Sequence, residues 1–235
     1  MDNLEATNGT VLFGAVDYSK YDYLETQPID AHLGSQLEFG LTCNRVQFEN
    51  YQTNVNKTVT KNAIPVSMSY NYPQSEFPVS ILKQLVGYLG GTYNSSSSSQ
   101  EVSCDFLNDT DHFISFKFGL ERDKIELPVA DVVEQQDDKC MLKINKSEEK
   151  YPLITFGMDI LRYLYMVYDM ERFEISIGIR KFNDSPANIS VITKKTAKGP
   201  LDDQVNRAAL SMASSGYSGA TFAFILPILI SLLFW

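Results

Sequence analysis

Short apolar runs that partly alternate with polar residues recur along most of this chain. Each run is rich in Val, Ile and Phe, and each is bounded by Gly, Asp, Asn or Pro. This pattern is typical of the short strands of an all-β domain. It predicts strands at 11–17 (VLFGAVD), 112–119 (HFISFKFG), 124–129 (KIELPV), 140–144 (CMLKI) and 173–179 (FEISIGI).

Two segments show helical spacing instead. Residues 78–90 (PVSILKQLVGYLG) have apolar side chains at positions 81, 82, 85, 86 and 89, and the segment ends at Gly90-Gly91, as helices often do. Residues 158–169 (MDILRYLYMVYD) begin as a helical turn and run into a strand. We therefore expect an all-β fold with two short helices.

Polar stretches separate or follow these elements. Residues 92–100 (TYNSSSSSQ) are expected to form a flexible loop. From about residue 182 to 219 the chain is polar and lacks periodicity. We interpret residues 1–181 as one folded domain and residues 182–205 as a flexible stalk.

The last sixteen residues, 220–235 (ATFAFILPILISLLFW), carry no charge. A transmembrane helix needs about 20 apolar residues and usually has charged flanks. Small residues, a polar spacer and a terminal hydrophobic tail of about 10–20 residues are instead typical of a glycosylphosphatidylinositol (GPI) attachment signal. We expect residues 206–235 to be such a signal, removed on maturation; a tail-anchor helix and a buried C-terminal helix are the alternatives.

The attachment residue of such a signal must be small. Asn206 is preferred because it leaves a spacer of about a dozen residues, and Ser211 and Ser214 are alternatives. The mature protein would then be held by its lipid at the plasma membrane or in the cell wall, after passage through the secretory pathway.

Glycosylation motifs favour the same compartment. The N-x-[ST] pattern, which marks N-glycosylation acceptors in secreted proteins, occurs at Asn8, Asn56, Asn94, Asn108, Asn145, Asn183 and Asn188. The first residues have neither the basic nor the apolar region of a signal peptide. We therefore expect that the N-terminal part of the natural protein is absent from this sequence.

Composition excludes several classes of function. The formal net charge is −9, which argues against a nucleic-acid partner because phosphate binding needs clustered Lys and Arg. There is no CxxC motif, so we expect no zinc or other metal site and no cofactor. In an oxidising compartment Cys104 and Cys140 are the better disulfide pair, since both end strand-like runs, which leaves Cys43 free or without its partner.

The order of the segments resembles the C-terminal lobe of a pepsin-type aspartic protease, and specifically a yapsin, the GPI-anchored fungal branch. The stretch GTVLFGAVDYSKYDYLETQPI is similar to the strand-and-turn stretch of that family, and TFGMDILRYLYMVYDMERFEISIGI is similar to its closing segment. PVSILKQL resembles the helix after the second catalytic loop, and VSCD and CMLKI resemble the segments that form the disulfide of the lobe. The resemblance covers about residues 9–180.

The resemblance implies a catalytic loop, which this chain carries in altered form. The family uses one Asp-Thr/Ser-Gly loop from each of two lobes, and the two carboxylates share a proton and activate a water. Counting back from Phe77-Pro78, Ser69 occupies the position of the second catalytic Asp, and no Asp-[Thr/Ser]-Gly occurs in the chain. A serine hydroxyl does not ionise near neutral pH. We therefore name no catalytic residue.

Other candidate groups have simpler interpretations. Asp111, Asp123 and Asp159 are expected to be turn or capping residues, and Asp159 matches a structural Asp of the family. His32 and His112 lie near no nucleophile motif, so a catalytic triad is not expected.

Two functions follow from these observations. The first is an aspartic-type endopeptidase of the fungal cell surface, acting on cell-wall or secreted proteins, of which this chain is an inactive C-terminal half. Its partners would be a missing N-terminal lobe or another copy of the chain, peptide substrates, and a membrane through the GPI lipid. The alternative is a non-catalytic, GPI-anchored surface or cell-wall binding protein of the same ancestry.

Overall fold

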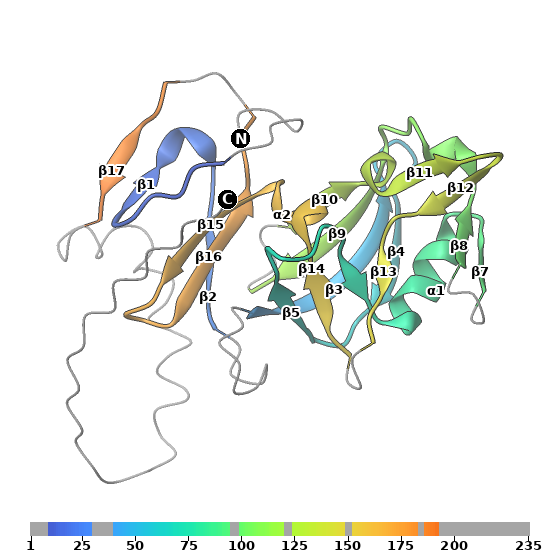
Figure 1. Ribbon diagram of the computed structural model, residues 1–235, viewed down its shortest axis with the longest axis horizontal. Helices are drawn as coiled ribbons and strands as arrows, with labels where there is room; N and C mark the ends of the chain where they lie inside the picture. Colours follow the sequence, from blue (N-terminus) through green and yellow to red (C-terminus); the bar gives the residue numbers. More distant parts are fainter. Residues whose placement is uncertain are drawn as a thin grey trace, which may run out of the picture. The chain divides into compact units, whose positions relative to one another are not determined.

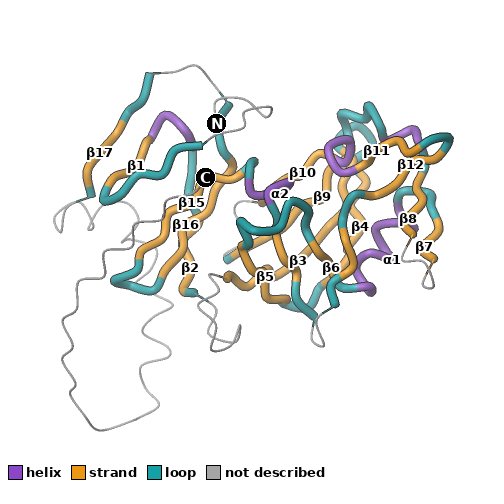
Figure 2. The backbone as a smooth tube through the Cα atoms, viewed as in Figure 1, coloured by secondary structure: helices purple, strands orange, loops and turns teal. Residues whose placement is uncertain are grey.

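The computed structural model describes residues 9–29, 40–94, 99–119, 124–148, 152–182 and 186–192. These residues form mainly strands joined by turns, together with two α-helices and short 3₁₀ turns (Figures 1 and 2). They lie in one unit, Met1–Thr193. The expected all-β lobe with two short helices is confirmed.

The largest sheet holds the segment expected to carry the catalytic loop. Its strands follow the order β10-β9-β3-β5-β14-β6-β13, and β4 pairs with β3 off this path. Their bounds are β3 Gly40–Asn50, β4 Val55–Thr60, β5 Ile64–Met68, β6 Glu76–Phe77, β9 His112–Phe118, β10 Lys124–Pro128, β13 Asn145–Lys146 and β14 Ile154–Phe156. Because β14 runs parallel to β5 and antiparallel to β6, the chain between β5 and β6 must pass the end of β14.

The long strand β3 has an irregular pattern for a physical reason. Its pairing with β9 shifts register between Cys43 and Arg45, as at a β-bulge, where one strand has an extra residue. Leu41 and Cys43 are fully buried before the shift, and Val46 and Phe48 are buried after it. The strict two-residue period is therefore broken, although both halves face the core.

A four-stranded sheet in the order β11-β12-β8-β7 lies in the same unit. Its strands are β7 Thr92–Asn94, β8 Ser99–Val102, β11 Val133–Gln136 and β12 Lys139–Leu142. β7 and β8 pair antiparallel, so the prediction of a wholly flexible loop over 92–100 is wrong at both ends of that range. Backbone pairing outweighs the polar composition there, while residues 95–98 lie outside the described residues.

The expected disulfide is present. It joins Cys104, in the 3₁₀ turn η3 (Cys104–Phe106), to Cys140 in β12. Cys43 is a free thiol with no exposed surface, and burial raises its pKa to about 12. A buried thiol in the core is not placed to pair with a cysteine outside the lobe.

Two smaller sheets contain the ends of the described chain. One has the order β15-β16-β2, and the other pairs β1 with β17. The bounds are β1 Ala15–Asp17, β2 Glu25–Pro28, β15 Leu164–Asp169, β16 Glu174–Ile179 and β17 Ile189–Val191. β17 falls within the range 182–205 that we interpreted as a stalk, yet its residues pair in register with β1, for example Ala15 with Val191.

The helices begin and end close to their expected bounds. α1 (Val79–Tyr88) buries Ile81, Leu82, Leu85 and Val86, and α2 (Met158–Leu161) precedes β15. Gly90 follows α1 with a left-handed φ of 68°, a conformation that glycine adopts at low cost. Two further 3₁₀ turns in the described part of the chain are η1 Tyr18–Lys20 and η4 Val129–Val132. Among the described residues, no helix is both long and apolar enough to cross a membrane.

Candidate functional site

The loop that follows β5 is the candidate site, and Ser69 is its first residue. The Ser69 amide donates a hydrogen bond to the Phe156 carbonyl at 2.9 Å, which continues the pairing of β5 with β14 by one step. Ser69 is half-buried. The residue expected at the catalytic aspartate position therefore lies where two parallel strands end side by side.

The loop is fastened to the start of α2 by Ser75 and Asp159. The Ser75 amide donates to Asp159 Oδ2 at 3.0 Å, and the Ser75 hydroxyl donates to Asp159 Oδ1 at 2.6 Å. The same hydroxyl accepts a hydrogen bond from the Gly157 amide at 2.9 Å. Ser75 has no exposed surface, so these contacts satisfy a polar side chain that would otherwise be costly to bury.

Backbone contacts complete this attachment. The Met158 amide donates to the Tyr72 carbonyl at 2.8 Å, and the Asp159 amide donates to the Pro73 carbonyl at 3.2 Å. A Cβ atom at Gly157 would lie 2.6 Å from the Gln74 carbonyl carbon. Only glycine lets the loop approach this closely, so the loop is fixed by its backbone as well as by Ser75.

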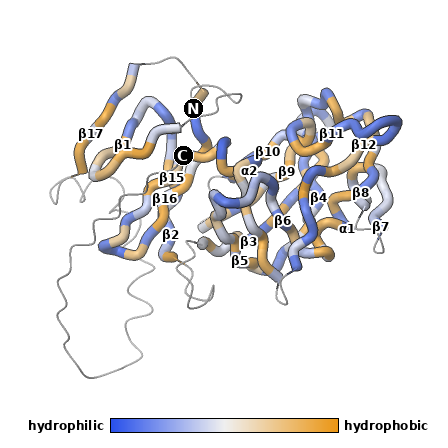
Figure 3. The backbone as a smooth tube through the Cα atoms, in the orientation of Figure 1, coloured by the Kyte–Doolittle hydropathy of each residue, from blue (hydrophilic) through white to orange (hydrophobic). Residues whose placement is uncertain are grey.

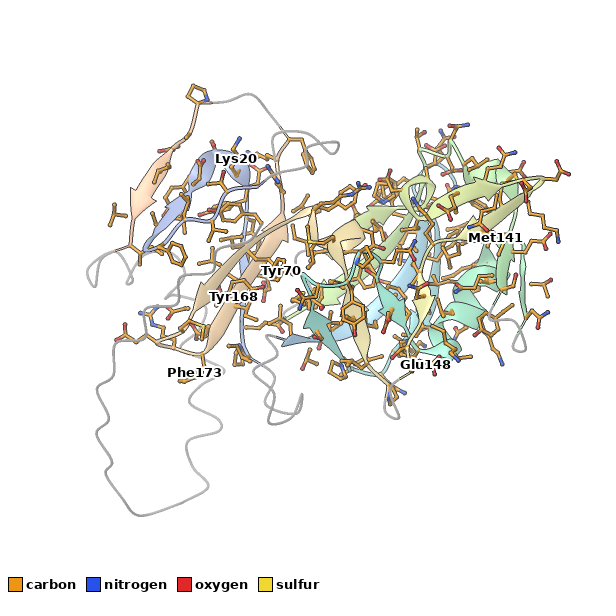
Figure 4. All side chains as sticks on the ribbon, in the orientation of Figure 1. Lys20, Tyr70, Met141, Glu148, Tyr168 and Phe173 are labelled. Atoms are coloured by element: carbon orange, nitrogen blue, oxygen red, sulfur yellow. A yellow bond between two sulfur atoms is a disulfide. The ribbon has the colours of Figure 1, made fainter. Side chains whose placement is uncertain are left out.

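The loop carries two exposed tyrosines. Tyr70 and Tyr72 are 54% and 46% exposed. The Tyr70 hydroxyl lies 2.8 Å from the Tyr168 hydroxyl, which comes from β15 (Figure 4). Burial raises the pKa of both phenols, and the Tyr70 contact raises that of Tyr168 further. Both therefore stay neutral at acid and neutral pH and supply no base.

The loop has no ionised group suited to acid–base catalysis. Between Ser69 and Phe77 the only acidic residue is Glu76, which lies in β6 and pairs with Thr155 and Asn145. A serine hydroxyl needs a base to become a nucleophile. The loop therefore has a supported backbone and holds no carboxylate between Ser69 and Ser75.

The other acidic candidates have structural roles where they are described. Asp159 holds the loop through Ser75 and also accepts from the Ile160 amide. Asp111 accepts from the Thr110 hydroxyl at 3.5 Å. Asp137 and Asp138 lie in the turn that joins β11 to β12, and Asp137 has a left-handed φ of 54°. Asp123 lies outside the described residues.

The histidines are not brought to the site. His112 contacts Asp109 and Asn50, and His32 lies outside the described residues. In the described part of the chain, no group of three or more His, Cys, Asp or Glu residues is arranged to hold a metal ion.

The predicted modification sites divide between described and undescribed parts of the chain. Asn56, Asn94, Asn108, Asn145 and Asn188 are exposed, as a glycan acceptor must be, and their glycosylation stays a prediction. Asn8, Asn183 and the GPI candidates Asn206, Ser211 and Ser214 lie outside the described residues.

Sequence reasoning predicted the structural role of Asp159, but it missed Ser75, Gly157 and the Tyr70–Tyr168 contact. That Ser69 occupies the catalytic position stays a prediction. The spacing of Gly157 and Asp159 within TFGMDILR was visible in the sequence. Their partner Ser75, however, lies 84 positions from Asp159. No local pattern links residues so far apart.

The fold is that of one lobe of a pepsin-type aspartic protease domain, and the chain belongs to the eukaryotic aspartyl protease family, which it matches over residues 1–179. It is 32% identical over 180 residues to secreted aspartic protease 10 of Candida albicans, covering 76% of this chain and 37% of that protein. It is 27% identical over 222 residues to aspartic proteinase yapsin-3 of Saccharomyces cerevisiae, covering 92% and 42%.

A third relative is the probable aspartic-type endopeptidase opsB of Aspergillus oryzae, which is 29% identical over 228 residues, covering 94% of this chain and 46% of that protein. The chain thus spans less than half the length of these curated relatives.

Proposed function

We propose that this chain is the C-terminal lobe of a yapsin-like aspartic endopeptidase of the fungal cell surface, and that it does not cleave peptides by itself. One observation carries the proposal. The loop at Ser69 is held by Ser75, Gly157 and Asp159, but the position expected to hold the second catalytic Asp carries a hydroxyl.

The chemistry of the family explains the second half of this proposal. Two carboxylates at close range share a proton, so one acts as base while the other acts as acid. A lobe with Ser69 provides neither group. Joined to a second lobe, it would offer a peptide-binding surface with at most one carboxylate.

The same observation favours a second candidate, a non-catalytic surface protein that binds peptides or cell-wall polymers. The supported loop would then be kept for its shape, with Tyr70 and Tyr72 exposed to contact a ligand. The predicted glycans and GPI lipid would place either protein at the cell surface.

A two-lobed protein separates the two candidates. We would join the N-terminal half of a curated relative to this chain and compare Ser69 with Ser69→Asp in a pepstatin-sensitive peptide cleavage assay at acid pH. The endopeptidase proposal predicts cleavage only after Ser69→Asp. Ser80→Asp is the matched control, because it adds the same charge at an exposed position near the start of α1.

A gain of cleavage with Ser69→Asp, but not with Ser80→Asp, would support a protease lobe in which position 69 lacks the catalytic carboxylate. Binding of the peptide without any gain would favour the non-catalytic binding protein. A two-lobed protein with Ser69 that cleaves as well as Ser69→Asp would contradict the proposal.

A further inference from the structure

The loop after β5 exposes four successive residues, Tyr70, Asn71, Tyr72 and Pro73. We call these four residues the aromatic surface. No residue from 69 to 75 carries a charge. The surface therefore presents two aromatic rings, their phenol hydroxyls and a side-chain amide, all of them uncharged.

The backbone beneath the aromatic surface is held in place by the start of α2. The Tyr72 carbonyl accepts a hydrogen bond from the Met158 amide at 2.8 Å, and the Pro73 carbonyl accepts one from the Asp159 amide at 3.2 Å. A ligand that binds to a surface already held in one conformation does not have to order it, and this favours affinity.

The side chain of Tyr70 is held as well. Its hydroxyl lies 2.8 Å from the hydroxyl of Tyr168, and Figure 4 shows the two labelled side chains next to each other. Tyr168 packs against the hydrophobic core and donates a hydrogen bond to Met166 Sδ at 3.7 Å. An anchored partner therefore orients the exposed ring of Tyr70, which makes Tyr168 a positioning residue.

The loop offers side chains to a ligand more readily than backbone. A peptide that binds as an added strand pairs with free N–H and C=O groups. The Ser69 amide already donates to the Phe156 carbonyl, and the carbonyls of Tyr72 and Pro73 already accept from α2. Proline also has no amide hydrogen to donate. These contacts disfavour an extended peptide as the ligand of the aromatic surface.

A sugar chain suits the groups that remain. The face of an aromatic ring carries partial negative charge, so it attracts the C–H groups on one face of a hexose ring. Phenol hydroxyls and the Asn71 amide both donate and accept hydrogen bonds, as the hydroxyls of a sugar do. Rigid tyrosines combined with polar side chains also form the binding loops of antibodies at low entropic cost.

We propose that the aromatic surface binds an uncharged polysaccharide chain, and that Tyr168 positions Tyr70 for this contact. The inference names a ligand class for the second candidate function and rests on it.

Calorimetric titration of the full chain with uncharged hexasaccharides tests the proposal. The probes are laminarihexaose, chitohexaose and mannohexaose, and we expect at least one of them to bind. Tyr70→Ala and Tyr72→Ala should each raise the Kd of that probe by about tenfold, because each removes an aromatic contact. Tyr18→Ala is the control, since it removes a tyrosine of similar exposure, 51%, from η1, and it should leave the Kd unchanged.

Tyr168→Phe tests the positioning role, because it keeps the ring and removes only the hydroxyl. The Kd should rise by about threefold, as expected for one lost hydrogen bond. Tyr88→Phe is matched to it, since it removes a phenol hydroxyl that donates to the Thr58 carbonyl at 3.2 Å. A general loss of stability would affect both variants, whereas positioning predicts a higher Kd for Tyr168→Phe alone.

A parallel titration with an uncharged hexapeptide containing leucine and phenylalanine separates the possible failures. Tighter binding of the peptide than of every hexasaccharide would overturn the polysaccharide inference and leave the second candidate function standing. Absence of binding by all four probes would overturn both. Equal rises of the Kd in Tyr18→Ala and Tyr70→Ala would also refute the assignment of this surface.

Discussion

The loop that begins at Ser69 is held in place by Asp159. Asp159 accepts three hydrogen bonds, two from Ser75 and one from the Ile160 amide. None of them involves Ser69, whose amide donates to the Phe156 carbonyl and whose side chain makes no hydrogen bond within the described part of the chain. The side chain at position 69 is therefore free to vary without disturbing the support of the loop.

Replacing the Asp159 carboxylate should lower the stability of the fold. Asp159→Asn removes one of the two oxygens that bind Ser75 and presents an amide donor to the Ser75 amide. Hydrogen bonds to charged groups contribute about 1.5–3 kcal/mol, so we expect the free energy of unfolding to fall by about 2–3 kcal/mol. Urea denaturation measures the change.

Asp138→Asn, in the exposed turn between β11 and β12, is the control and should change the free energy of unfolding by less than about 0.5 kcal/mol. Equal effects of the two substitutions would show that Ser75 and Asp159 do not hold the loop.

At the residue scale, the sequence identified single positions but not their partners. Ser69 was singled out by its offset from Phe77-Pro78, and Asp159 by its match to a structural Asp of the family that the segments resemble. No motif singled out Ser75, since a serine is common in a polar loop. Its importance comes from burial and from a contact across the sheet, which depend on tertiary structure.

At the element scale, the close approach of the loop to the start of α2 depends on Gly157. This glycine has an ordinary φ of −89°, so the requirement is one of space and not of backbone conformation. A Cβ atom would lie 2.8 Å from the Tyr72 carbonyl oxygen and closer still to Gln74 backbone atoms. Backbone atoms cannot rotate away as a flexible side chain can.

Gly157→Ala should therefore lower the free energy of unfolding by about 3 kcal/mol or more. Gly87→Ala provides a matched comparison, because a Cβ atom at Gly87 in α1 meets nothing within 4 Å. Alanine is preferred to glycine within helices, so this change should raise stability by about 0.5–1 kcal/mol. Thermal and urea unfolding of both variants would check the predicted opposite signs.

Elements with regular patterns were predictable, and interrupted ones were not. The helix α1 and the strands β9, β10 and β16 follow their apolar patterns closely. β3 was missed because the register shift after Cys43 breaks its alternation. β7 and β8 were taken for a loop because their residues are polar, although they pair as a hairpin.

At the scale of the whole molecule, the described lobe leaves apolar residues uncovered on β17 and just before β1. Phe13 and Val11 are 91% and 76% exposed, and Val191 is 65% exposed. Figure 3 colours much of β17 and of the chain around β1 as hydrophobic. Exposed apolar patches commonly mark a contact surface, which agrees with the proposed second lobe and with a chain that spans 37–46% of the relatives compared above.

The most direct test of the account is peptide cleavage by the purified chain itself at acid pH, with and without pepstatin. Catalysis in this family requires a pair of carboxylates, and the loop at Ser69 supplies none. We therefore predict no turnover above the buffer blank and no effect of pepstatin. Pepstatin-sensitive turnover by this chain alone would contradict the proposal that the loop at Ser69 is supported but provides no catalytic carboxylate.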